Sequence, residues 1–232
     1  MQIKIPEIMN LPLFRGISEA DLKPMLACVC PEIRKYCRGE TVVPANGPLK
    51  GVGVLLSGEA EVKRESASGA RSIIGFVEKG GVFGEMSAFS GGRVWPATVT
   101  AKTGCTVMFI PTSRFLGNCG RSCAAHKALI QNMLRILSEK AVSLSRKVEY
   151  LSIKSMRGKI CAYLLEQSDL IGGPAFILPM NRNDLADYLG VSRPSMSREM
   201  GRLRDEGVID FYMSGVRILD MDRIKKFALK AP

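Results

Sequence analysis

Arg198 lies in a stretch whose residue spacing would expose it near the start of a helix. Ser192 is a suitable N-cap, and Met196, Met200 and Leu203 recur at spacings of four and three, which places them on one face. At about 100° per residue, Arg198 then points away from that face. An exposed guanidinium at this position suits the guanine edge in the DNA major groove, which accepts hydrogen bonds at O6 and N7.

Neighbouring side chains could contact the same DNA. The candidates for base reading are Arg193, Pro194, Ser197 and Arg198. The candidates for phosphate contacts are Arg182, Ser192, Ser195, Arg202 and Arg217. Phosphate contacts position a protein on DNA but do not specify the sequence. A single arginine is more often a solvated surface residue, so the prediction depends on the agreement of cap, apolar phase, turn and wing.

The cysteines and the histidine suggest a second kind of chemistry. Two groups have spacings of interest: Cys28, Cys30 and Cys37, and then Cys119, Cys123 and His126. The second group would share one helical face and could hold a metal, an iron-sulfur cluster or haem, which makes a redox or gas sensor an alternative. The competing interpretation is that the seven cysteines are free thiols, buried or on the surface. We expect no metal.

Catalysis has few candidate residues. The sequence contains one histidine, no phosphate-binding P-loop and no Gly-x-Ser-x-Gly nucleophile motif. We therefore expect no catalytic residues and no enzyme activity, with a thiol- or metal-dependent enzyme as the alternative of another class.

The elements that would position Arg198 form a winged helix-turn-helix. A helix is expected over Gly158–Asp169, and Asn181 can cap a second over Arg182–Leu189. Gly190 turns the chain, and the helix that follows Ser192 runs to about Glu206. Strands over Val208–Phe211 and Val216–Leu219 make the wing. The second helix of such a motif enters the major groove.

A long helix precedes this motif, from about residue 121 to 153. Its apolar residues recur every seven positions on two adjacent rows, and together they form a narrow seam: Ile130, Leu134, Leu137, Ala141, Leu144, Val148 and Leu151. A seam of this kind needs a partner helix, so we expect a homodimer through a coiled coil of about 45 Å. The alternative is a single helix packed on its own domain.

The first half of the chain has the pattern of an antiparallel β-structure. Short β-prone segments alternate with glycine-containing turns over Val52–Leu56, Ala60–Lys63, Ser72–Val77, Ala97–Ala101 and Thr106–Ile110. This spacing indicates a sandwich or barrel. A small amphipathic helix over residues 18–30, capped by Ser18, precedes it. The expected fold class is α+β.

Composition supports a polyanionic partner. The 232 residues carry a formal net charge of +11, which favours nucleic acid. Residues 154–232 contain 13 Lys or Arg against 10 Asp or Glu, so most of the excess lies earlier in the chain. No apolar run suggests a signal peptide or a membrane span, and we expect a cytoplasmic protein.

Three segments resemble one known family. Phe83-Gly84-Glu85-Met86, Pro96-Ala97-Thr98-Val99 and the stretch from Asp184 to Arg198 look like the cyclic-AMP receptor protein and fumarate-nitrate reduction regulator (Crp/Fnr) family of transcription regulators. The resemblance covers about Leu13 to Leu219. It implies a cyclic-nucleotide-binding-like β-roll over residues 1–120, a dimerisation helix over 121–154 and a DNA-binding domain over 155–232. It also implies palindromic double-stranded DNA as a partner, with RNA polymerase as a further candidate.

The resemblance also gives the DNA-reading positions and the effector pocket. Ser197 and Arg198 match base-contacting positions of the family, whereas Pro194 replaces an acidic residue that often reads a base. The implied pocket residues are Gly84, Glu85, Met86, Ser87, Arg93, Trp95, Pro96, Ala97, Leu144 and Ser145.

Part of this pocket departs from the nucleotide-binding members. Gly84-Glu85 match the ribose-binding pair, but Trp95-Pro96 replace the pair that grips the cyclic phosphate, and Leu144 cannot hydrogen-bond adenine. Arg93 would share a strand face with Trp95, displaced by about 6.6 Å. We therefore expect a small-molecule effector that is more apolar than cyclic AMP.

Overall fold

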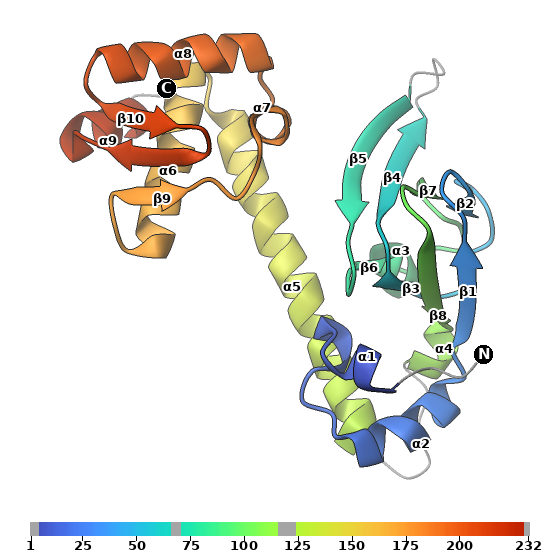
Figure 1. Ribbon diagram of the computed structural model, residues 1–232. Helices are drawn as coiled ribbons and strands as arrows, with labels where there is room; N and C mark the ends of the chain where they lie inside the picture. The colour runs from blue at the N-terminus through green and yellow to red at the C-terminus, as the bar shows by residue number, and fades with distance from the viewer. Residues whose placement is uncertain (1–4, 66–70, 116–123, 230–232) are drawn as a thin grey trace. The chain divides into compact units, whose positions relative to one another are not determined.

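The computed structural model describes residues 5–65, 71–115 and 124–229 (Figure 1). The chain divides into two compact units, Met1–Glu139 and Lys140–Pro232. The division falls inside the long helix α5 (Ala124–Ser152), which therefore belongs partly to each unit. The domain limits given by the sequence stay a prediction.

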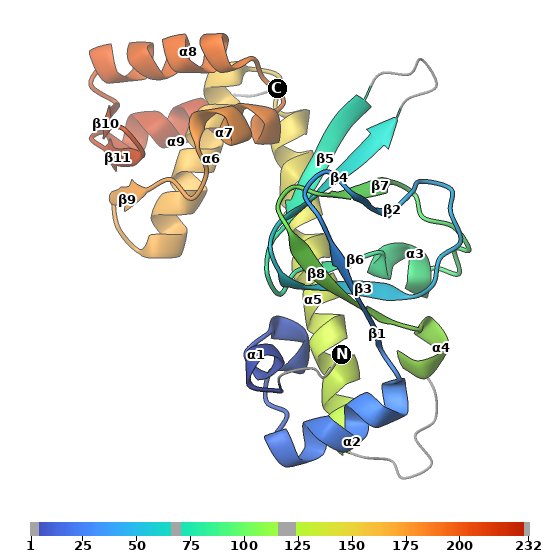
Figure 2. The same cartoon turned by 45° about the vertical axis from the view of Figure 1, so that its right-hand side comes forward.

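The first unit contains two four-stranded antiparallel sheets. Its strands are β1 (Glu32–Tyr36), β2 (Thr41–Val43), β3 (Val52–Ser57), β4 (Ala60–Glu65), β5 (Arg71–Val77), β6 (Val82–Phe83), β7 (Thr98–Ala101) and β8 (Cys105–Ile110). The strand orders are β1-β8-β3-β6 and β2-β7-β4-β5, with every pair antiparallel. Side chains from both sheets meet in one buried core. The two sheets form the expected β-roll (Figure 2).

Helices cover the outer face of the β1-β8-β3-β6 sheet. They are α1 (Ile5–Met9), the short 3-10 helix η1 (Pro12–Phe14), α2 (Glu19–Val29), α4 (Thr112–Phe115) and the first half of α5, while α3 (Glu85–Phe89) follows β6. Along β3, Val52 and Val54 face the helices and Leu55 faces the roll interior, so alternation buries both faces of the strand. Ser18 caps α2 by accepting a hydrogen bond from the Asp21 amide, as predicted.

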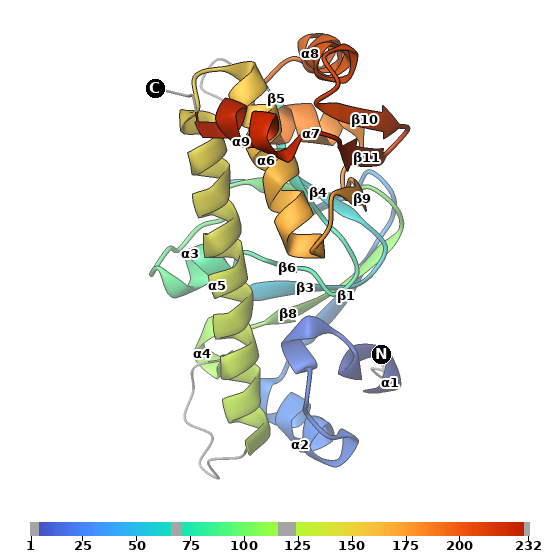
Figure 3. The same cartoon turned by 90° about the vertical axis from the view of Figure 1, so that its left-hand side faces the viewer.

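The second unit is a winged helix-turn-helix (Figure 3). After the end of α5 come α6 (Met156–Ile171), β9 (Ala175–Ile177), α7 (Arg182–Leu189), α8 (Arg193–Asp205), β10 (Ile209–Tyr212), β11 (Gly215–Ile218) and α9 (Met221–Leu229). The antiparallel sheet has the order β10-β11-β9, so the wing has one strand more than the predicted hairpin. One apolar core joins all of these elements.

The turn between α7 and α8 has the expected chemistry. Asn181 caps α7 by accepting hydrogen bonds from the Asn183 and Asp184 amides. Gly190 ends the helix with φ of 64°, a left-handed conformation that glycine adopts without a steric penalty. The α7–α8 pair is thereby fixed by local residues.

Candidate nucleic-acid interface and effector site

The N-terminus of α8 is organised by two serines and a proline. Ser192 caps the helix by accepting a hydrogen bond from the Ser195 amide at 3.3 Å, and the two side-chain hydroxyls lie 2.8 Å apart. Pro194 occupies the first turn, where its missing N–H leaves no intrahelical bond unmade. The first turn is rigid and still offers its remaining N–H groups to solvent or to a phosphate.

The two faces of α8 differ as the spacing predicted. Met196, Met200 and Leu203 are at most 1% exposed and pack into the core of the second unit. The predicted base-reading side chains, Arg193, Pro194, Ser197 and Arg198, are all exposed. In the described part of the chain, no carboxylate forms a salt bridge with Arg198, and its one polar contact there is with the Ser195 hydroxyl at 3.3 Å. Its guanidinium is available to a ligand.

An ion-pair network that was not predicted from the sequence holds one flank of α8, between its exposed and buried faces. Arg157 of α6 donates from Nε to Glu199 at 2.6 Å and from both terminal nitrogens to Glu206 at 2.7 and 2.9 Å. These hydrogen bonds raise the pKa of Arg157 and lower that of Glu206. Arg223 of α9 donates to the Glu206 carbonyl at 2.8 Å. The network fixes α8 against α6 and α9.

Arg202 has a different environment from Arg198. It forms a salt bridge with Glu199 at 3.1 Å within α8, yet its side chain is 68% exposed. Because the Arg202 side of this pair faces solvent, its guanidinium can also reach another anion. Arg202 therefore stays available for the predicted phosphate contact.

Arg182 joins the helix-turn-helix to the wing. Its guanidinium lies 5.0 Å from the ring centre of Phe211 and donates to the Met200 sulfur and, at 3.3 Å, to the Met213 carbonyl. Burial lowers the pKa of this arginine. The residue has a structural role in addition to the phosphate contact proposed for it.

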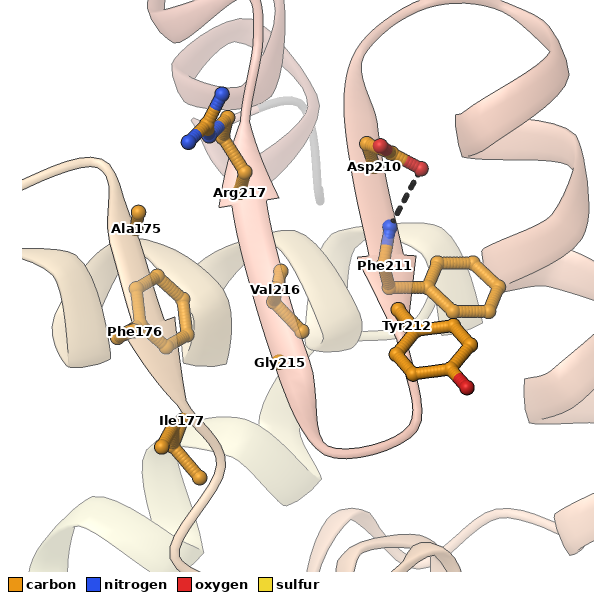
Figure 4. Close-up of a pocket in the computed structure, with 9 residues that line it drawn as sticks. All are labelled: Ala175, Phe176, Ile177, Asp210, Phe211, Tyr212, Gly215, Val216 and Arg217. Atoms are coloured by element: carbon orange, nitrogen blue, oxygen red, sulfur yellow. Dashed lines mark hydrogen bonds between the residues drawn. The ribbon is translucent and has the colours of Figure 1, made fainter.

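The exposed face of the wing sheet carries Arg217 and an aromatic residue (Figure 4). Arg217 lies opposite Asp210 on the neighbouring strand, and the Asp210 carboxylate accepts a hydrogen bond from the Phe211 amide. Tyr212, next to the turn, is 79% exposed and lines a shallow surface hollow of about 470 Å³ with Ile177. Tyr212 was not predicted as a site residue. Its position beside the wing turn is the feature of the sequence that could have indicated it.

In the β-roll, Trp95 lies against the residue pair that resembles a ribose site. The indole is 2% exposed, and its ring centre lies 5.8 Å from that of Phe83. A Cβ built on Gly84 would stand 2.1 Å from an indole carbon, so the tryptophan is in direct contact with this glycine. Gly84 also has φ of 79°, which favours glycine. Glu85 begins α3 and is 1% exposed.

The prediction that Arg93 shares a strand face with Trp95 is wrong. Residues 91–97 do not form a strand, and Arg93 is exposed while Trp95 is buried, so the two side chains do not share a face. Backbone hydrogen bonds explain why this segment is a loop. The Trp95 amide donates to the Gly47 carbonyl, and the Trp95 carbonyl accepts from the Asn46 amide. The remaining predicted pocket residues are Met86 and Pro96, exposed; Ser87, half-buried; Ala97, buried; and Leu144 and Ser145, exposed in the second unit.

The possible metal ligands do not assemble within the part of the chain that the structure describes. There, no group of three or more His, Cys, Asp or Glu residues could hold a metal ion. Cys119 and Cys123 lie outside the described residues. His126 lies near the start of α5 and is buried, with Nε2 at 3.0 Å from the Phe115 carbonyl oxygen.

The predicted seam of α5 is largely exposed. Its exposed members are Leu134, Ala141, Leu144, Val148 and Leu151, with Leu134 at 59% and Val148 at 64%. Ile130 and Leu137 pack partly against the core of the first unit. A row of exposed leucine and valine on one helix is a surface that an identical helix can cover. None of the described helices combines the length and apolarity needed to cross a membrane.

Comparison with protein families matches both halves of this architecture. Residues 33–121 match the cyclic nucleotide-binding domain, and residues 158–227 match the Crp-like helix-turn-helix domain. Among curated relatives, the probable transcriptional regulator flp of Lacticaseibacillus casei is 28% identical over 59% of each chain. The nitrogen fixation regulation protein FixK of Bradyrhizobium diazoefficiens is 26% identical over 83% of this chain and 80% of its own length.

The fold has counterparts among solved structures. The c-di-GMP responsive global regulator CLP of Xanthomonas campestris matches with a TM-score of 0.58 and 20% identity, covering 88% of this chain and all of that one. The catabolite activator protein of Thermus thermophilus matches with a TM-score of 0.53 and 21% identity, over 94% and 98% of the two chains. At these identities the likeness concerns the fold alone.

Proposed function

We propose, from the premise that this chain belongs to the Crp/Fnr family of transcription regulators, that it acts as a homodimer whose two α8 helices read a palindromic operator. The family consists of transcription regulators and not of enzymes, so no catalytic residue is assigned. The observation that carries the proposal is the exposed Arg198, without a carboxylate partner in the described residues, on a capped helix whose opposite face is buried. Because DNA is the target, we also propose a cytoplasmic location.

Dimerisation through α5 is supported by the exposed seam. Leu134, Leu144 and Val148 each expose about half or more of their surface, which is unfavourable in water and is relieved when a second copy covers them. Two-fold symmetry would present two α8 helices to two half-sites one helical turn apart.

The DNA contacts that we propose fall into two classes. Arg198, with Arg193, Pro194 and Ser197, would approach the base edges, whereas Arg182, Ser192, Ser195, Arg202 and Arg217 would hold phosphates. The Asp210 carboxylate beside Arg217 weakens its local positive potential. We therefore expect a phosphate contact of modest strength at the wing.

Substitution of Arg198 and Arg217 tests this assignment. Arg198→Ala should cost about 1 to 3 kcal/mol per site and relax discrimination at one base pair of each half-site. Arg217→Ala should weaken all sequences alike and reduce the salt slope by about one unit. The measurement is binding to a half-site library at several salt concentrations. An unchanged base preference in Arg198→Ala would mean that other residues of α8 face the bases.

For the effector, we propose a small molecule that is not cyclic AMP. Contact between Trp95 and Gly84 supports it, because a ribose could approach this glycine only if the indole moved. Pro96 supplies no N–H or hydroxyl to a phosphate.

Calorimetry with cyclic AMP checks this part of the proposal. We expect no saturable heat at micromolar nucleotide with the wild-type protein, and none with Arg93→Gln. Micromolar affinity in the wild type would overturn the prediction, and its loss in Arg93→Gln would identify Arg93 as the phosphate ligand.

A further inference from the structure

A second pocket lies in the first unit, away from Gly84 and Trp95. It has a volume of about 570 Å³ and is bounded on one side by the segment from Met9 to Ile17 and on the other by the first half of α5. This volume is within the range of small-molecule sites. Both walls lie in residues 1–139, so the pocket does not depend on the second unit.

A buried asparagine joins the two walls of the pocket. Asn132 of α5 is 6% exposed, and its amide nitrogen donates to the Leu13 carbonyl at 3.1 Å and to the Arg15 carbonyl at 2.8 Å. These two bonds fasten the backbone of the N-terminal segment to the helix. The Arg15 backbone is thereby tied to α5 at the pocket that Arg15 lines.

Two arginines supply positive charge to the lining. Arg15 comes from the N-terminal segment and Arg135 from α5. Within residues 5–65, 71–115 and 124–229, no salt bridge engages either guanidinium. Glu139 lines the same wall, so a ligand with several negative charges would be repelled by its carboxylate.

Part of the remaining lining is apolar. Ile17 is buried at 5% exposure, and Met9 and Ile136 are half-buried, so all three offer hydrocarbon surface beside the two guanidinium groups. A pocket with an apolar wall and cations that have no partner suits a molecule with a hydrocarbon part and one carboxylate.

The pocket opens on the face of α5 that the seam does not use. Asn132, Arg135, Ile136 and Glu139 follow the spacing of one helical face. Leu134 lies about 200° around the helix from Asn132, and Leu137 lies about 200° from Arg135. A second copy packed on the seam would leave the pocket accessible.

We propose that this pocket binds a small organic monocarboxylate, with Arg15 and Arg135 holding the carboxylate and Met9, Ile17 and Ile136 contacting the hydrocarbon part. The ligand would tie the N-terminal segment to the helix that carries the dimer seam. Its action as an effector of DNA binding rests on the proposed function, whereas its binding does not.

Calorimetry on the full chain tests the site with butyrate, hexanoate and octanoate as probes and 1-hexanol as the uncharged control. We expect saturable binding of at least one acid, stronger than that of the alcohol. Arg15→Gln and Arg135→Gln should each weaken it about tenfold or more, because a charge-assisted hydrogen bond is lost. Arg38→Gln removes the same charge from an exposed position elsewhere in the unit and should leave binding unchanged.

A further variant separates the pocket from general charge effects. Ile136→Trp fills the space without altering charge and should abolish binding, with the folded state of every variant checked by its thermal unfolding. No binding of any acid at millimolar concentration, or equal weakening in Arg38→Gln, overturns the site. Binding that leaves operator affinity unchanged in a mobility-shift assay overturns the effector role alone. A chain that binds the acid but no DNA overturns the proposed function and leaves the site standing.

Discussion

Three tyrosines pack edge to face inside the second unit, and their hydroxyl groups have different environments. The ring centres of Tyr150, Tyr163 and Tyr188 lie 5.7 to 6.0 Å apart. The Tyr150 hydroxyl donates to Glu166, which also pairs with Arg146 at 2.8 Å. The buried Tyr163 hydroxyl has no hydrogen-bond partner among the described residues. Burial raises the pKa of Tyr163 to about 12.

Tyr163→Phe should therefore stabilise the second unit. Removal of a buried hydroxyl without a partner should raise the free energy of unfolding by about 1 kcal/mol at neutral pH. The hydroxyl stays neutral in the fold up to about pH 12 but ionises near pH 10 in the unfolded chain. Stability is consequently lost as the pH rises from about 10 to 12, and the phenylalanine variant should lose less.

Denaturant unfolding at pH 7 and about pH 11 measures both effects, with Tyr150→Phe as the matched control. That control removes a hydroxyl bonded to Glu166 and should destabilise the protein. Equal destabilisation by the two substitutions would show that Tyr163 has a partner in solution.

At the scale of elements, α5 should determine the oligomeric state. Leu144→Glu would place two like charges in the seam of a symmetric dimer and should weaken association by about 3 kcal/mol or more. Ser143→Glu adds the same charge on an exposed position of the next face and should have little effect. Sedimentation of the two variants gives the comparison.

If Leu144→Glu sediments as the same dimer as the wild type, α5 is not the interface. Loss of the dimer in both variants would indicate that total charge, and not the seam, controls association.

Elements with local signals could be predicted from the sequence. Ser18, Asn181 and Ser192 cap α2, α7 and α8 as expected, because an N-cap bond involves residues only two or three positions apart. The strands β1, β2, β6 and β9 were missed; β2, β6 and β9 have only two or three residues each, and β9 depends on pairing with β11. Helix α9 was also missed; it packs on the core of the second unit through the buried Ile224.

In the candidate DNA-binding site, too, the features with local signals could be predicted from the sequence. The exposed face of α8 follows from its own 3.6-residue period, so Arg198 was placed correctly on the exposed side. Arg157 was missed because its partners Glu199 and Glu206 lie 42 and 49 residues away. The second pocket joins the N-terminal segment to α5 across more than a hundred residues, a juxtaposition that no local pattern encodes.

At the scale of the whole molecule, the net charge of +11 attracts any DNA sequence. Specific binding must then come from the shape and chemistry of α8, which a symmetric dimer presents twice. Neither net charge nor a single helix would select DNA sites with two-fold symmetry, whereas a symmetric dimer would.

The measurement that tests this account most directly is selection of binding sites by the wild-type protein from a pool of random DNA duplexes. The account predicts enriched sites with two-fold symmetry, whose half-sites are centred about 10 base pairs apart or a multiple of that spacing and contain a guanine that Arg198→Ala no longer selects. Enrichment of single, unpaired half-sites, or no enrichment over the starting pool, would contradict it.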